Sequence, residues 1–179
     1  LSESCDVIVL DTPGSDSPLS RTGHSYADIL ITPMNDSFVD LDLLGRVDFE
    51  TNEVLALSDY SEMVWEQKKT RAQRDGGTID WVVMRNRLAA LDSRNKRNMD
   101  VALEGLSQRL GFRLAHGFSE RVIFRELFLK GLTLLDVREE GADVTLTMSH
   151  MAALQEVRNL LQTIGVPEAF ETPEIAAVR

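Results

Sequence analysis

The sequence predicts an α/β fold with a mostly parallel sheet flanked by helices. Two observations lead to this prediction. Short apolar runs rich in β-branched residues alternate along the chain with longer segments of helical periodicity, the order that produces parallel sheets through crossover connections. The apolar runs also end at turn or polar residues, as buried parallel strands do.

The predicted strands are short and apolar. The first, over residues 7–10, is a continuous Val/Ile/Leu run that stops at Asp11 and suits a strand buried on both faces. The second ends before Pro33, which cannot donate to a central ladder. The strands expected are residues 7–10, 29–32 and 79–84, with residues 112–114 as a shorter possibility.

The predicted helices combine apolar spacing with start and stop signals. A cap signal at residues 35–37 precedes apolar residues at positions 38, 41, 44 and 47, and glycines follow three of the longer segments. The helices expected start after Ser37, cover residues 59–74, run from a cap at Ser93 to Leu110, and cover residues 122–129 and 147–164. Residues 166–179 carry two prolines and no periodicity, so we expect a loose tail after a single domain portion over residues 1–165.

Composition excludes several classes of protein. The 179 residues are 43% hydrophobic, enough for one core, but no apolar run approaches the roughly 18 residues that cross a bilayer, so no membrane insertion is expected. A single cysteine excludes an internal disulfide framework and suits a reducing cytoplasm. The net charge of −10 is uneven: residues 36–66 hold nine acids and one base, and residues 68–97 hold nine bases and three acids.

Asp11 stands at the end of the first predicted strand, where ligands of open parallel sheets bind. A carboxylate there can hold the magnesium ion of a nucleotide, often through water. Pro13 and Gly14 then turn the chain sharply. The alternative is an ordinary aspartate that caps a loop at the end of a strand.

Asn86 stands at the end of the third predicted strand. Its carboxamide can both donate to and accept from the edge of an adenine. The alternative is an asparagine that simply forms a turn.

Residues 7–14 resemble the Walker B and switch II segment of the ParA/MinD family of P-loop ATPases. Longer strings over residues 31–45, 61–66, 80–88 and 121–136 resemble its MipZ branch, so the resemblance covers nearly the whole chain except the tail. It implies that Asp11 serves Mg²⁺ and that Thr12, Pro13 and Gly14 form the nucleotide-sensing switch. It also implies that Asn86 binds the adenine of ATP, that Arg87 is a further nucleotide-binding residue, and that a later loop near Phe118 completes the adenine pocket.

The function implied by this resemblance is a molecular switch. ATP lets two subunits form a homodimer that binds double-stranded DNA without sequence preference, binds the partition protein ParB, and inhibits assembly of the division protein FtsZ. Hydrolysis returns the dimer to monomers. The protein is expected in the cytoplasm, associated with the nucleoid and enriched toward the cell poles, where it restricts division to midcell.

A basic cluster supplies the predicted DNA contact. Arg94, Lys96 and Arg97 lie within four residues at a helix start, and Arg121 and Arg125 are outlying members. Such a cluster neutralises phosphates, and because no aromatic residues are interleaved, contact with the duplex backbone is expected rather than base stacking. The alternative is a solvated helix face.

The phosphate-binding loop G-x-x-x-x-G-K-[S/T] does not occur in the sequence. By resemblance, it and the first switch are expected upstream of Leu1, so the chain as given is expected neither to hold ATP well nor to hydrolyse it. The three histidines show no metal-ligand spacing and no dinucleotide fingerprint is present. Two other functions stay open: a ParA-type partition or cargo-positioning ATPase, and a non-catalytic interaction domain.

Overall fold

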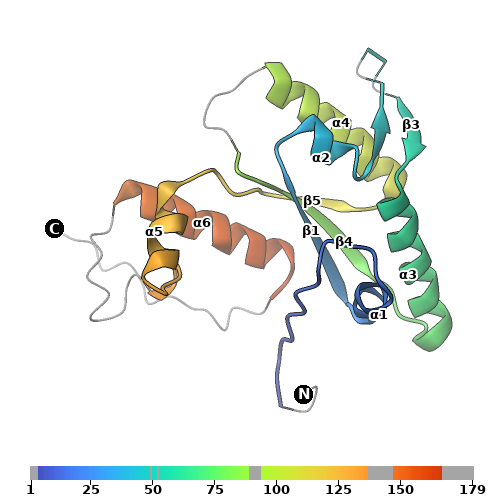
Figure 1. The fold of residues 1–179 in the computed structure, drawn as a ribbon, viewed down its shortest axis with the longest axis horizontal. Helices are drawn as coiled ribbons and strands as arrows, with labels where there is room; N and C mark the ends of the chain where they lie inside the picture. The colour runs from blue at the N-terminus through green and yellow to red at the C-terminus, as the bar shows by residue number, and fades with distance from the viewer. Residues whose placement is uncertain (1–3, 49, 52, 89–93, 137–146, 167–179) are drawn as a thin grey trace.

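The computed structural model describes residues 4–48, 50–51, 53–88, 94–136 and 147–166 (Figure 1). Its centre is a three-stranded sheet of β1 (Ile29–Asn35), β4 (Asp80–Asn86) and β5 (Arg113–Ala115). The strand order is β1-β4-β5 and both pairs are parallel. Helices lie on either side of the sheet in Figure 1. The predicted α/β class with a parallel sheet is therefore confirmed.

The strand β1 is longer than predicted because it continues through Pro33 to Asn35. Asp80 N–H donates to the Asp28 carbonyl and Asp36 N–H donates to the Asn86 carbonyl. The backbone N–H and C=O groups of the even-numbered residues from 28 to 36 therefore point toward β4. The missing N–H of Pro33 therefore lies on the opposite edge, with which no described strand pairs. A proline on that edge costs no ladder bond, which is why it does not end the strand.

The helices α3 (Asp59–Asp75) and α4 (Arg94–Leu110) pack on one face of the sheet and build the main core. Trp81 of β4 is 1% exposed, donates from Nε1 to the Thr32 hydroxyl at 3.0 Å, and meets Tyr60 and Phe112 edge-on. Lys68 of α3 places its ammonium 5.6 Å from the centre of the Trp81 ring and 5.5 Å from that of Trp65. This face of the sheet is therefore buried beneath the two helices.

Left-handed glycines end both of these helices, as predicted. Gly76 has φ 71° at the end of α3 and Gly111 has φ 66° after α4. The predicted end of α4 at Leu110 agrees with the structure, and its expected cap, Ser93, lies outside the described residues.

The helices α5 (Val122–Leu129) and α6 (Met148–Thr163) form a second, smaller apolar cluster. Its buried members are Ile123, Leu127, Leu134, Ala153 and Leu154. Both helices agree with the predicted ranges, and Thr147 caps α6 through its hydroxyl. The predicted tail lies outside the described residues apart from Val166. No helix among the described residues is long and apolar enough to span a bilayer.

The helix predicted after Ser37 is much shorter than its apolar spacing indicates. Ser37 caps α2 as expected, but α2 covers only Phe38–Leu41. The chain then forms an antiparallel hairpin of β2 (Gly45–Val47) and β3 (Val54–Leu57). Leu44 and Val47, predicted to lie in the later turns of a helix, are both buried. Leu44 lies in the loop before β2 and Val47 lies in β2.

The strand predicted over residues 7–10 is wrong. These residues join no ladder and their side chains are exposed, Val9 by 86%. A buried strand needs a hydrogen-bonded neighbour and cover on both faces, and neither is present for this segment. The chain instead leads into α1 (Pro18–Tyr26), which the sequence analysis missed although Ser17 and Ser20 form a capping box around Pro18.

Candidate functional site

The carboxyl end of β4 is joined to a later loop by backbone hydrogen bonds. Phe118 N–H donates to the Arg85 carbonyl at 2.9 Å, Leu88 N–H to the Phe118 carbonyl at 2.9 Å, and Glu120 N–H to the Leu88 carbonyl at 3.1 Å. This short parallel pairing places the loop over residues 117–120 beside Asn86. The structure therefore brings together the residues predicted to bind the base.

Asn86 itself ends β4 with its side chain directed into a local turn. Its Oδ1 accepts a hydrogen bond from Arg87 N–H at 2.9 Å, and Asn86 is half-buried. Arg87 has φ 55°, the only positive φ of a non-glycine residue among those described. A non-glycine residue in this conformation carries strain that is typical of functional sites.

Gly117 permits the close approach of the two segments. A Cβ atom at this position would lie 2.2 Å from the Arg85 carbonyl oxygen and 2.8 Å from Leu88 Cδ1. Both distances are far below van der Waals contact, so a side chain here would push the loop away from β4. The glycine is required by space rather than by backbone conformation.

Arg85 fastens the same end of the sheet to its neighbours. Its guanidinium donates to Asp36, after β1, at 3.0 Å and to Asp100 of α4 at 2.5 Å. Arg85 and Asp36 are 16% and 13% exposed, so the pair is largely shielded from water. These two residues were included in the sequence analysis only in the counts of acidic and basic side chains, and no local pattern marks them as partners.

The other side of the loop is fastened to α6. Glu156 accepts hydrogen bonds from the Ser119 hydroxyl at 2.7 Å and from Arg121 Nη2 at 2.8 Å. Burial alone would raise the pKa of Glu156, but the hydrogen bonds from Arg121 and Ser119 outweigh it and hold the pKa below its ordinary value. The carboxylate is therefore charged in the folded protein at neutral pH.

The predicted magnesium and switch residues lie apart from this assembly. Asp11, Pro13 and Gly14 are exposed, while Thr12 packs near Gly23 of α1. The segment is tied to α1 by an ion pair from Arg21 to Asp16 at 2.6 Å. No group of three metal-ligating side chains occurs among the described residues, and Asp11 presents a single exposed carboxylate.

The predicted DNA-binding residues fall into two groups. Arg94, Lys96 and Arg97 occupy the first turn of α4, where Lys96 is half-buried and Arg97 exposed, and Arg125 on α5 is 72% exposed beside Glu120. Arg121 is only 21% exposed and is bound by Glu156. Its guanidinium is therefore engaged inside the protein, unlike that of Arg125.

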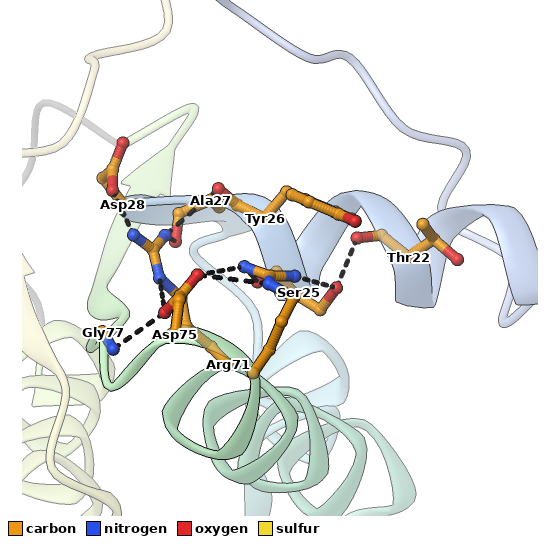
Figure 2. Close-up of polar contacts among 9 residues, drawn as sticks. Thr22, Ser25, Tyr26, Ala27, Asp28, Arg71, Asp75 and Gly77 are labelled. Atoms are coloured by element: carbon orange, nitrogen blue, oxygen red, sulfur yellow. Dashed lines mark hydrogen bonds and ion pairs between the residues drawn. The ribbon is translucent and has the colours of Figure 1, made fainter.

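Two other cations of the base-rich stretch over residues 68–97 stabilise the fold. Arg71 donates to the carbonyls of Tyr26 and Ala27 and to Asp28, and it is also paired with Asp75 (Figure 2). Arg74 donates to the Ser25 carbonyl and lies 3.9 Å from the centre of the Tyr26 ring. These two side chains of α3 fix the end of α1 where it leads into β1.

The parallel sheet with helices on both sides is consistent with a P-loop NTPase-like fold, and polar residues gather beyond the carboxyl end of its central strand, where ligands of open α/β sheets bind. The family model described as "ATPase MipZ" matches residues 1–168 of this chain. The chain therefore belongs to the MipZ family of ATPases, and the resemblance drawn from the sequence is confirmed. No curated protein matches the chain.

Proposed function

We propose that the protein is an ATP-dependent dimerising switch that positions the division site by inhibiting FtsZ assembly. In this proposal the ATP-bound homodimer also binds ParB and non-specific double-stranded DNA, in the cytoplasm over the nucleoid and toward the cell poles. Membership of the MipZ family supports the ATPase part. The observation that carries nucleotide binding is the hydrogen-bonded pairing of residues 85–88 with residues 117–120.

The adenine of ATP fits the end of β4. The Asn86 carboxamide has a second oxygen lone pair and an NH₂ group with which to meet both donor and acceptor positions of the base. The half-buried Phe118, 6.2 Å from the Phe124 ring, offers an apolar wall beside it. Arg87 follows directly and is exposed, so its cation can reach phosphate or ribose.

The phosphate end depends on residues that the described sheet does not hold together. Asp11 would hold Mg²⁺ through water once the segment over residues 7–10 joins a sheet, and Thr12 to Gly14 would sense the terminal phosphate. Bound magnesium neutralises charge that develops on the phosphates during hydrolysis. The phosphate-binding loop itself is proposed to lie upstream of Leu1.

Binding to duplex DNA is supported by the charge at the start of α4 and at Arg125. These cations lie on two helices, and dimerisation would double the number that meet the phosphates. Glu156 already binds the guanidinium of Arg121 and Glu120 binds that of Arg125, so at either arginine a DNA phosphate would replace a carboxylate of the protein.

The test uses the full-length protein. FtsZ polymerisation is followed by light scattering with the protein added in ATP or in ADP. Suppression in ATP alone, abolished by Asp11→Ala and by Asn86→Ala, is the expected result. DNA binding in ATP without any effect on FtsZ would instead identify a ParA-type positioning ATPase, and indifference to nucleotide in every assay would identify an interaction domain.

A further inference from the structure

We propose that Glu156 of α6 and Arg121 are positioning residues that set the base specificity of the nucleotide site by holding the loop over residues 117–121 in place. The inference rests on the proposed role of Asn86 and Phe118 in binding adenine. It assigns a function to a half-buried ion pair that lies outside the residues expected to touch ATP.

The loop is held on two sides by different kinds of contact. On the side of β4 it is held by the three backbone hydrogen bonds to residues 85–88. On the far side it is held by Glu156, which receives the Ser119 N–H at 3.3 Å, the Ser119 hydroxyl at 2.7 Å, and Arg121 through Nη2 at 2.8 Å and Nε at 3.4 Å. All of these contacts converge on one carboxylate.

The local backbone explains this convergence. Arg121 is extended, with φ −133° and ψ 138°, immediately before α5. In extended chain, residues two apart point to the same side, so Ser119 and Arg121 both reach α6. Phe118 lies between Gly117, which packs against β4, and Ser119, which is bound by Glu156. Its position beside the end of β4 therefore depends on both contacts.

The contact is half-buried and bidentate, with Arg121 Nη2 and Nε donating to the two carboxylate oxygens of Glu156. Arg121 and Glu156 are 21% and 16% exposed, and Glu156 is the only acidic residue of α6. A forked guanidinium contact loses its geometry when either partner changes, even if the charge is kept. A shift of the loop by a fraction of an ångström would alter the distance between Asn86 and the base edge, which is where ATP and GTP differ.

The experiment measures the affinities of the full-length protein for fluorescent ATP and GTP analogues. Wild type is expected to prefer ATP, and Asn86→Ala to lower that preference. Glu156→Gln and Arg121→Lys are each expected to lower the ATP-to-GTP preference about tenfold, with the double variant no worse than either single one. Glu62→Gln, the same substitution at an exposed position of α3, serves as the matched control.

The outcomes distinguish failure of the proposed base site from failure of the positioning role of Glu156 and Arg121. If wild type does not discriminate between the nucleotides, the proposed base site fails. If Asn86→Ala removes discrimination but Glu156→Gln lowers both affinities by the same factor, the pair is merely structural and the inference is overturned. Should Glu156→Gln fold poorly, Ser119→Ala removes one hydroxyl bond with little change in volume; an unchanged preference in that variant overturns the inference as well.

Discussion

The carboxyl end of β4 and the segment over residues 7–14 carry the two halves of the proposed nucleotide site, and the fold holds them very differently. The end of β4 is fixed by backbone hydrogen bonds to residues 117–120 and by the half-buried side chains of Arg85 and Glu156. Residues 7–10 have a similar apolar composition to β4, yet they pair with no strand and are exposed. An apolar run becomes a buried strand only where the fold supplies a neighbour.

The comparison is tested most strongly by truncating one side chain in each region. Trp81→Ala, in β4, is expected to lower the free energy of unfolding by about 3–5 kcal/mol, because it removes a fully buried indole. Val9→Ala, in the exposed segment, is expected to change it by less than about 0.5 kcal/mol. Urea unfolding measures both, and equal losses would show that residues 7–10 are packed in solution.

Gly117→Ala is expected to disrupt the contact between β4 and the loop over residues 117–120. Its Cβ atom would meet the Arg85 carbonyl and Leu88, and the resulting displacement is expected to cost about 1–3 kcal/mol. Thermal unfolding gives the loss. Gly14→Ala, which would meet nothing within 4 Å, is the control in the other region, and a loss there as large as at position 117 would contradict the contrast.

Arg71→Ala removes the side chain that joins α3 to the end of α1. It deletes hydrogen bonds to two backbone carbonyls and to Asp28, and a loss of about 2 kcal/mol is expected because these bonds come from a charged donor. Lys69→Ala, whose partner Glu66 is also exposed, is expected to cost less than about 1 kcal/mol. A larger effect for Lys69 in urea unfolding would reverse this ranking.

The smallest expected effect is the acid dependence of the Glu156 contact. Hydrogen bonds hold the pKa of Glu156 below its ordinary value of 4.5 in the folded state, so its stabilising contribution is complete above that pH and is lost as pH falls through the lower, folded value. The contribution is expected to be about 1 kcal/mol. Melting temperatures of Glu156→Gln and wild type should therefore converge in acid; a constant difference would argue against a charged pair.

Much of the fold could be predicted because its signals are local. The glycine stops at positions 76 and 111, the cap at Ser37, and the amphipathic spacing of α5 and α6 all appear within a few residues of sequence. The errors arose where a distant partner decides the structure. Leu44 and Val47 fit a helix by spacing but are buried by the β2–β3 hairpin, and residues 7–10 fit a strand that has no neighbour.

The site divides in the same way. Asn86 and Phe118 could be predicted as neighbours from the family resemblance, and the backbone pairing brings them together. Glu156 could not, because its partners Ser119 and Arg121 lie more than 30 positions earlier and no motif links them. Arg71 and Arg74 were counted among the bases of residues 68–97, since composition alone does not show that backbone carbonyls at the end of another helix accept hydrogen bonds from them.

The stack around Lys68 gives the protein an optical probe of its own. The sequence contains two tryptophans, one almost fully shielded at position 81 and one 43% exposed at position 65, with the same ammonium near both rings. A collisional quencher in the buffer reaches the outer indole and not the inner one. Separation of α3 from the sheet would expose the second emitter, so the departure of this helix could be followed by intrinsic fluorescence without any label.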